Sequence, residues 1–205
     1  FPEVEAALLK VKADRFVVDG EIIILIDGKL SFDDLLQRIH PAASRVQKLS
    51  TETPARFVVF DFLVDTKGRS LIDEPLAKRR EALEAFVAGH LTDPIFELSP
   101  ATTDIKLAQS WLKTMRGQLD GLVAKSLSLP YVSGERAMRK IKNLREADCV
   151  VGGFRYLAKE KLVGSLLLGL YDDQGLLHHV GFTSSMEAAG REALTKKLNR
   201  LTAPP

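Results

Sequence analysis

The chain of 205 residues has a mass of 22.6 kDa and contains 45% hydrophobic and 27% charged residues, a composition typical of a globular protein with one large or two small domains. Its formal net charge of +2 excludes a protein that coats nucleic acid through an overall cationic surface, but it is compatible with a local basic patch. The single cysteine, Cys149, excludes a disulfide framework and a cysteine-rich zinc site, and no apolar run reaches the length of a membrane span.

Helices and strands alternate in the first portion of the chain. In order, we expect a helix over residues 2–12, strands over 16–18 and 22–26, a turn at Asp27-Gly28, a helix over 32–48 capped by Ser31, a strand over 57–64, a helix over 75–88, a strand over 95–98, a helix over 103–115, and strands over 121–126 and 137–143.

The second portion follows a polar boundary at residues 145–148. Three strands are expected over 149–157, 162–171 and 176–183, and a final helix runs from a cap at Ser185 to about Arg200. The short connections indicate an antiparallel meander. The order therefore predicts an α+β fold, with a first domain of antiparallel sheets and helices at 1–145 and a small β-barrel domain at 146–205.

Acidic residues interrupt three of the apolar strands. Asp19 and Glu21 lie in the first, Asp61 lies in the strand 57–64, and Asp120 begins the run that ends at Lys125. An unpaired buried charge costs several kcal/mol, so each acid has a partner or faces a polar cleft. In one such strand the acid would most simply mark a strand end or bulge at the surface, whereas three such strands favour a shared polar site.

A pair of lysines marks the strand 137–143. Lys140 and Lys142 are two residues apart and would share a strand face, where an anion such as phosphate would relieve their repulsion. Arg136, Arg139 and Arg145 complete a local basic patch that suits nucleic acid. The alternative is a solvated edge strand that its lysines protect from pairing.

The sequence lacks the motifs that are typical of zinc sites, P-loops and dinucleotide-binding folds. The four histidines have no i,i+4 pair and no cysteine partner, and neither a P-loop nor a G-x-G-x-x-G sequence occurs. Carboxylates for a divalent cation, paired lysines for phosphate and an aromatic strand for base stacking together indicate a nucleotide-using site in a cleft.

The ordered segments Asp19-Gly20-Glu21, Phe57–Asp61, Asp120–Lys125 and Lys140-Ile141-Lys142 resemble four motifs of the ATP-dependent DNA ligases. The second portion is similar to bacterial ligases of the end-joining repair type. The resemblance implies a nucleotidyltransferase (adenylation) domain followed by an OB-fold domain. It also implies an enzyme that seals nicks in duplex DNA through enzyme-adenylate and DNA-adenylate intermediates.

Residue roles follow from the resemblance. Glu21 would bind the ribose of ATP and Phe60 would stack on the adenine. Lys140 and Lys142 would act as catalytic residues that hold the phosphate undergoing transfer.

The resemblance also implies a metal site and macromolecular partners. Asp120, where the family usually has glutamate, and Glu21 would bind Mg²⁺ or Mn²⁺, and the three arginines of the basic patch would contact DNA. The expected partners are nicked or broken double-stranded DNA and an end-binding repair protein. We expect a monomer in the bacterial cytoplasm, associated with the nucleoid and not with a membrane.

One departure from the family concerns the nucleophile. The family uses the lysine of a Lys-x-Asp-Gly motif, which does not occur here, and the near match at Lys12 is interpreted as a decoy. The sequence is therefore expected to be the central part of a ligase, incomplete at both ends and inactive alone. The alternatives are an RNA ligase or capping-type nucleotidyltransferase, and a non-catalytic nucleic-acid-binding fragment.

Overall fold

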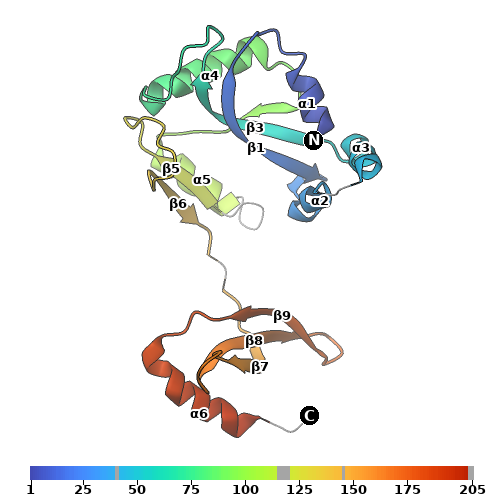
Figure 1. The fold of residues 1–205 in the computed structure, drawn as a ribbon, viewed down its shortest axis with the longest axis vertical. Helices are drawn as coiled ribbons and strands as arrows, with labels where there is room; N and C mark the ends of the chain where they lie inside the picture. The colour runs from blue at the N-terminus through green and yellow to red at the C-terminus, as the bar shows by residue number, and fades with distance from the viewer. Residues whose placement is uncertain (40–41, 115–120, 145, 203–205) are drawn as a thin grey trace. The chain divides into compact units, whose positions relative to one another are not determined.

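The computed structural model describes residues 1–39, 42–114, 121–144 and 146–202 (Figure 1). The chain divides into two compact units, Phe1–Leu144 and Arg145–Pro205. Both combine sheets with helices, which confirms the predicted α+β class. The described residues contain no helix with the length and apolar character that crossing a membrane requires.

The described part of the first unit is built on a four-stranded sheet of order β2-β1-β3-β4. Its strands are β1 (Val17–Ile26), β2 (Lys29–Leu30), β3 (Ala55–Val64) and β4 (Phe96–Leu98). The central pair β1–β3 is antiparallel, and β4 lies parallel to β3. The predicted turn at Asp27-Gly28 is confirmed, since both residues have positive φ angles of 50° and 74° and join β1 to β2.

Helices surround this sheet in the first unit (Figure 1). They are α1 (Pro2–Leu8), α2 (Phe32–Gln37), α3 (Ala43–Glu52), α4 (Leu76–His90) and α5 (Ile105–Thr114). The main core forms where α4 packs on β3, with Leu83 and Phe86 of the helix against Val59 and Phe62 of the strand. Because Leu83 and Val59 are both 0% exposed, this contact anchors the middle of β3, where Phe60 and Asp61 lie.

Three predicted boundaries in the first unit were wrong. The expected helix 32–48 is two helices, α2 and α3, with Pro41 in the sequence between them, although Ser31 caps α2 as predicted. Helix α1 ends at Leu8 instead of residue 12. The strands expected over 16–18 and 22–26 are one strand, because β1 continues through the acidic segment with shifts in its register against β3.

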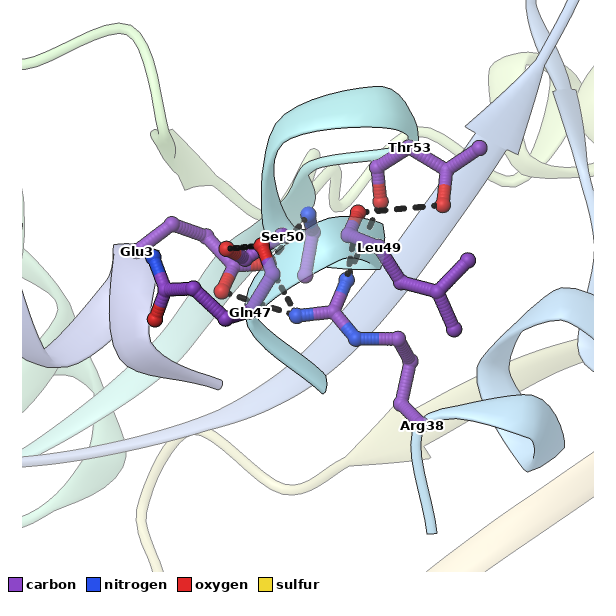
Figure 2. A network of polar contacts seen from close by, with 7 residues as sticks. Glu3, Arg38, Gln47, Leu49, Ser50 and Thr53 are labelled. Atoms are coloured by element: carbon purple, nitrogen blue, oxygen red, sulfur yellow. Dashed lines mark hydrogen bonds and ion pairs between the residues drawn. The ribbon is translucent and has the colours of Figure 1, made fainter. Parts of the chain in front are cut away.

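A buried arginine joins the start of the chain to the sheet (Figure 2). Arg38 is 6% exposed and donates from Nη2 to both carboxylate oxygens of Glu3 at 2.7 and 2.8 Å. Its Nη1 donates to the carbonyl oxygens of Thr53 at 3.1 Å and Leu49 at 3.3 Å, and Glu3 also accepts from the Ala55 N–H at 2.9 Å. This network holds α1 against α3 and the first residue of β3.

A separate two-stranded antiparallel sheet completes the described part of the first unit. It consists of β5 (Gly121–Lys125) and β6 (Met138–Lys142). Asn143, directly after β6, donates from Nδ2 to the carbonyl oxygen of Leu112 on α5 at 3.0 Å. The segment after β5 lies against the start of α4, where the Leu76 and Ala77 N–H groups donate to the carbonyl oxygens of Leu129 and Leu127 at 3.0 Å.

The second unit is a meander, as predicted. Its described elements are β7 (Val150–Tyr156), β8 (Val163–Tyr171), β9 (Leu177–Thr183), a 3₁₀ turn (Ala188–Gly190) and α6 (Arg191–Leu201). The three strands pair antiparallel in the order β7-β8-β9, an open sheet that is consistent with part of an OB-type barrel. The expected cap at Ser185 was wrong, since α6 begins at Arg191 after the 3₁₀ turn.

Candidate functional site

The register of β1 and β3 places Glu21 opposite Val58, two residues before Phe60. Gly20 lies opposite Val59, and Asp19 lies opposite Asp61, so the register shifts at Phe60, which has no cross-strand partner. Val59, directly before Phe60, is fully buried in the core. Glu21 is exposed and Phe60 is partly exposed, so both side chains remain accessible in this part of the central strand pair.

Glu21 is available to a ligand. Its side chain is exposed, and among the described residues it has no hydrogen-bonding or ion-pair partner. Phe60 is partly exposed beside it. A carboxylate acceptor and an open aromatic face are the groups that a nucleoside would engage through its ribose hydroxyls and its base.

Gly20 is required by the close approach of the two strands at this point. A Cβ atom there would lie 2.7 Å from the Val58 carbonyl oxygen and 2.6 Å from Cε2 of Phe57. Any other residue would push β1 away from β3 and displace Glu21 from its place opposite Val58. The position of Glu21 therefore depends on the absence of a side chain at Gly20.

The register of β5 and β6 gathers three lysines on one face. Lys140 lies opposite Val123, which is two residues from Lys125, and Lys142 follows two residues after Lys140. This agrees with the prediction that Lys140 and Lys142 share a face and adds Lys125, to which the sequence analysis gave no role. Arg139 falls on the opposite face, so the predicted basic patch is divided between the two faces of β6.

A cation–π contact joins the two sheets. The Nζ atom of Lys125 lies 4.4 Å from the centroid of the Phe60 ring. Phe60 is therefore in contact with the face that carries the three lysines. The ammonium groups of the lysines would compensate the charge of an anion bound beside this contact. The aromatic ring of Phe60 and the carboxylate of Glu21 would lie on the other side of that anion.

Gly121 determines how closely β6 approaches β5. Its φ angle is +151°, and a Cβ atom there would lie 2.0 Å from the Ile141 carbonyl oxygen and 2.9 Å from Cα of Lys142. Only glycine allows this approach. The position of Lys142 thus depends on the absence of a side chain at residue 121.

Two predicted site residues, Asp120 and Arg145, lie outside the described residues. Arg136 and Arg139 are exposed. Within the described ranges no cluster of three or more histidine, cysteine, aspartate or glutamate side chains could hold a metal ion. The predicted metal site consists of Glu21 and Asp120, and only Glu21 lies in the described part of the chain. Its carboxylate offers the oxygen ligands that Mg²⁺ and Mn²⁺ prefer.

The other acids of the apolar strands have partners. Asp61 is 1% exposed and accepts from Nε and Nη2 of Arg79 at 2.7 and 3.0 Å. Asp19 accepts from the Tyr131 hydroxyl at 2.9 Å. Neither Arg79 nor Tyr131 was predicted as a partner of these acids. A buried acid needs a partner, but the sequence around the acid does not indicate where that partner lies.

Comparisons with known proteins identify the family of this chain. A family model described as the ATP dependent DNA ligase domain matches residues 1–142. DNA ligase C2 of Mycolicibacterium smegmatis is 46% identical, with 99% of this chain and 57% of that protein covered. DNA ligase C of Mycobacterium tuberculosis is 44% identical, with 98% and 57% covered. The chain thus spans less than three fifths of the length of these relatives.

More distant relatives and solved structures show the same pattern. A DNA ligase of Methanothermobacter thermautotrophicus is 35% identical over 79% of this chain and 30% of that protein. The solved structure named Pmar-Lig_PreS3 has a TM-score of 0.68 at 19% identity, with 98% of this chain and 48% of that chain covered. A structure from work on Lig E DNA ligases has a TM-score of 0.62 at 17% identity, with 86% and 64% covered. At such identities these structures support the fold alone.

Proposed function

The chain belongs to the ATP-dependent DNA ligase family, and on that premise we propose that it forms the nucleotide-binding core of an enzyme that seals nicks in duplex DNA with ATP. The observation that carries the proposal is the contact between Lys125 and Phe60. It joins Phe60, two residues from the cross-strand neighbour of Glu21, to the strand face of Lys140 and Lys142. Glu21, Phe60, Lys140 and Lys142 are the residues that the resemblance assigns to ATP.

The chain's own residues suit each part of the nucleotide. The partly exposed ring of Phe60 offers a stacking surface for adenine, and the exposed carboxylate of Glu21 can accept hydrogen bonds from ribose hydroxyls. Lys140 and Lys142 are exposed and share a face, so their ammonium groups can compensate phosphate charge. That compensation matters most as charge shifts onto the leaving group in the transition state.

The proposed reaction has three transfers. The Nζ of a lysine attacks the α-phosphorus of ATP and pyrophosphate leaves; the adenylate then passes to the 5′-phosphate of a nick; finally the 3′-hydroxyl attacks that phosphate and AMP leaves. No Lys-x-Asp-Gly sequence occurs in the 205 residues, so the lysine of the first transfer is not assigned to this chain. In every transfer Lys140 and Lys142 hold the reacting phosphate.

We propose that Glu21 and Asp120 hold a divalent cation, Mg²⁺ or Mn²⁺. Such an ion, when bound, would neutralise charge on the phosphate oxygens. The exposed carboxylate of Glu21 has the right donor chemistry. As aspartate, residue 120 has a carboxylate one methylene shorter than the glutamate usual in the family, which would alter its reach.

Basic side chains support a role for duplex DNA as the substrate. Arg136 and Arg139 are exposed and, with Arg145, are proposed to bind the phosphates of a nicked or broken duplex. The proposed setting is DNA repair, with an end-binding protein as partner, in the bacterial cytoplasm at the nucleoid. The domain assignment, adenylation at 1–145 and OB fold at 146–205, stays a prediction.

The test measures nucleotide and nick chemistry in the full-length protein. Lys140→Ala and Lys142→Ala should each lower the rate of nick sealing by at least about 100-fold, the usual effect of removing one group that stabilises transition-state charge. The matched control is Lys48→Ala, which removes a lysine that is 70% exposed on α3. Equal sealing rates in Lys140→Ala, Lys142→Ala and Lys48→Ala would contradict the proposed roles.

Substrate comparisons separate the alternatives. A ligase for DNA should seal nicked DNA faster than nicked RNA and use ATP in preference to GTP, whereas an RNA ligase or a capping-type enzyme would reverse one of these preferences. A non-catalytic fragment would bind nicks with steep salt dependence and no effect of ATP. The 205-residue chain alone, incubated with labelled ATP and Mg²⁺, should take up no covalent label that survives denaturing electrophoresis at alkaline pH.

A further inference from the structure

A feature that the proposed function leaves unused is a pair of facing acids. Asp19 of β1 and Asp61 of β3 are directly opposite each other in the register of the central strands. Like charges in opposite positions destabilise a sheet, so such a pair needs compensation. These two acids lie next to the nucleotide-facing residues, since Asp61 follows Phe60 and Asp19 precedes Gly20 and Glu21.

Arg79 compensates the acid on β3. Its guanidinium, 3% exposed, donates to both oxygens of Asp61, and its Nη1 donates to the carbonyl oxygens of Glu74 at 2.6 Å and Leu129 at 3.3 Å. Asp61 also accepts from the Phe62 N–H at 2.9 Å. The arginine is therefore fixed on three sides and gives its surroundings a rigid positive charge.

Tyr131 compensates the acid on β1. Its ring lies 5.8 Å from the Arg79 guanidinium, and its backbone N–H donates to the Ile72 carbonyl oxygen at 2.9 Å. From this fixed position its hydroxyl donates to Asp19 at 2.9 Å. This hydrogen bond, together with partial burial and the charges of Asp19 and Asp61, raises the pKa of Tyr131 above its usual value, although the charge of Arg79 acts in the opposite direction.

The hydrogen bond acts where the strand is least regular. The β1–β3 register shifts between Val17 and Val18 and again between Asp19 and Gly20, so regular pairing is interrupted on either side of Asp19. Among the described residues, the Tyr131 hydroxyl is the partner of the Asp19 side chain. It thereby holds the side chain of the residue from which the chain continues to Gly20 and Glu21.

We propose that Tyr131 is a positioning residue that holds Glu21 against the ribose of ATP through its hydrogen bond to Asp19. The proposal rests on the proposed function, because ribose binding by Glu21 belongs to it. Through Asp19 and Glu21, the Tyr131 hydroxyl would affect the binding of one ribose hydroxyl and not the binding of the whole nucleotide. Its loss should therefore change discrimination between nucleotides that differ in one ribose hydroxyl.

The experiment measures kcat/KM for adenylation of the full-length protein with ATP, 2′-deoxyATP and 3′-deoxyATP. One of the two analogues lacks the ribose hydroxyl that Glu21 binds, and the wild type should prefer ATP over that analogue. Tyr131→Phe should lower this preference by about tenfold, because a misplaced Glu21 carboxylate no longer accepts a hydrogen bond from that hydroxyl. The matched control is Tyr156→Phe, which removes another tyrosine hydroxyl, donating to Asn199 at 2.8 Å in the second unit. It should keep the wild-type preference.

Variants of Asp19 keep the test decisive if Tyr131→Phe does not fold. Asp19→Asn retains an oxygen acceptor for the hydroxyl and should keep the preference, whereas Asp19→Ala should lose it. In the double variant Tyr131→Phe with Asp19→Ala, the loss should be no larger than in either single variant, because both changes remove the same hydrogen bond.

Three results would overturn the proposal and are distinguishable. If Glu21→Ala removes the preference for ATP but Tyr131→Phe and Asp19→Ala both retain it, the positioning role is wrong and ribose binding by Glu21 stands. If Glu21→Ala itself retains the wild-type preference, ribose binding by Glu21 fails and the positioning role fails with it. A uniform decrease in kcat/KM for all three nucleotides in Tyr131→Phe also contradicts the proposal.

Discussion

Gly121→Ala tests whether the approach of β6 to β5 places the phosphate-binding lysines. The new Cβ atom would lie 2.0 Å from the Ile141 carbonyl oxygen, and such atoms essentially never come closer than 3.0 Å, so the strands must separate locally by about 1 Å. A φ angle of +151° is also unfavourable for alanine. The change therefore acts on Lys142, the cross-strand neighbour of Gly121.

The size of the effect follows from these contacts. An unfavourable φ angle costs about 1–3 kcal/mol, and a weakened backbone hydrogen bond between the strands costs about 1 kcal/mol more. The sheet is exposed on both faces, since Val123 on one face is 51% exposed and Ile141 on the other is 43% exposed. The strain should therefore open β6 locally instead of unfolding the whole unit.

Hydrogen exchange and single-turnover kinetics measure the two consequences. An opening cost lowered by about 2–4 kcal/mol corresponds to amide exchange in β6 that is about 30- to 1,000-fold faster. A displacement of about 1 Å at Lys142 should slow phosphate transfer by roughly 100-fold. Thermal unfolding of the core between α4 and β3 should change little.

Gly89→Ala is the matched control. Gly89 lies inside α4, and a Cβ atom there would have open space within 4 Å. That variant should be as active as the wild type and more stable by up to about 1 kcal/mol. If Gly121→Ala showed the same exchange rates in β6 and the same transfer rate as Gly89→Ala, the strand spacing would not place Lys142 and the reasoning would be wrong.

Two further predictions concern buried ion pairs. Arg79→Leu leaves the buried Asp61 carboxylate unpaired and should lower the free energy of unfolding by about 3–5 kcal/mol in urea titrations, whereas Arg80→Leu breaks only a partly exposed pair and should cost less than about 1 kcal/mol. Glu3→Gln should cost about 3 kcal/mol at neutral pH. Although burial raises the pKa of Glu3, hydrogen bonds from the Ala55 N–H and Arg38 hold it below its ordinary 4.5. The contribution of this depressed pKa to stability is present above 4.5 and is lost as the pH falls through the folded value, so the difference between Glu3→Gln and the wild type should shrink on acidification.

Patterns confined to neighbouring residues predicted much of the fold. The turn at Asp27-Gly28 and the meander of β7, β8 and β9 depend on local preferences, and both were confirmed. The division of the expected helix 32–48 into α2 and α3 was missed although Pro41 was visible in the sequence, because periodicity was given more weight than the proline.

The continuity of β1 could not be predicted from its own residues. Asp19-Gly20-Glu21 has the composition of a turn, and the sequence analysis therefore ended one strand before it and began another after it. The segment is nevertheless extended because Asp19 has a hydrogen-bonding partner in Tyr131, 112 residues away. Gly20 also fits where a side chain would meet the Val58 carbonyl oxygen. Neither condition can be recognised within a window of ten residues.

The lysine face was predictable in part. Strand periodicity alone indicated that Lys140 and Lys142 share a face. It could not indicate that Lys125 joins them or that Arg139 points away from them toward the other face, because both statements need the register between β5 and β6. The contact of Lys125 with Phe60 requires a further step, the placement of that sheet against β3.

Exposure separates the acids that the sequence could not tell apart. Asp19, Glu21 and Asp61 all interrupt apolar strands, and the cost of burying a charge applies to each in the same way. Asp61 is buried and is held by Arg79, Asp19 is held by Tyr131, and Glu21 is exposed without a partner among the described residues. A buried acid with a partner stabilises the sheet, whereas an exposed acid that neighbouring strands hold in place remains able to bind a ligand. The two paired acids therefore fix both central strands next to Glu21, the acid that is left for the nucleotide.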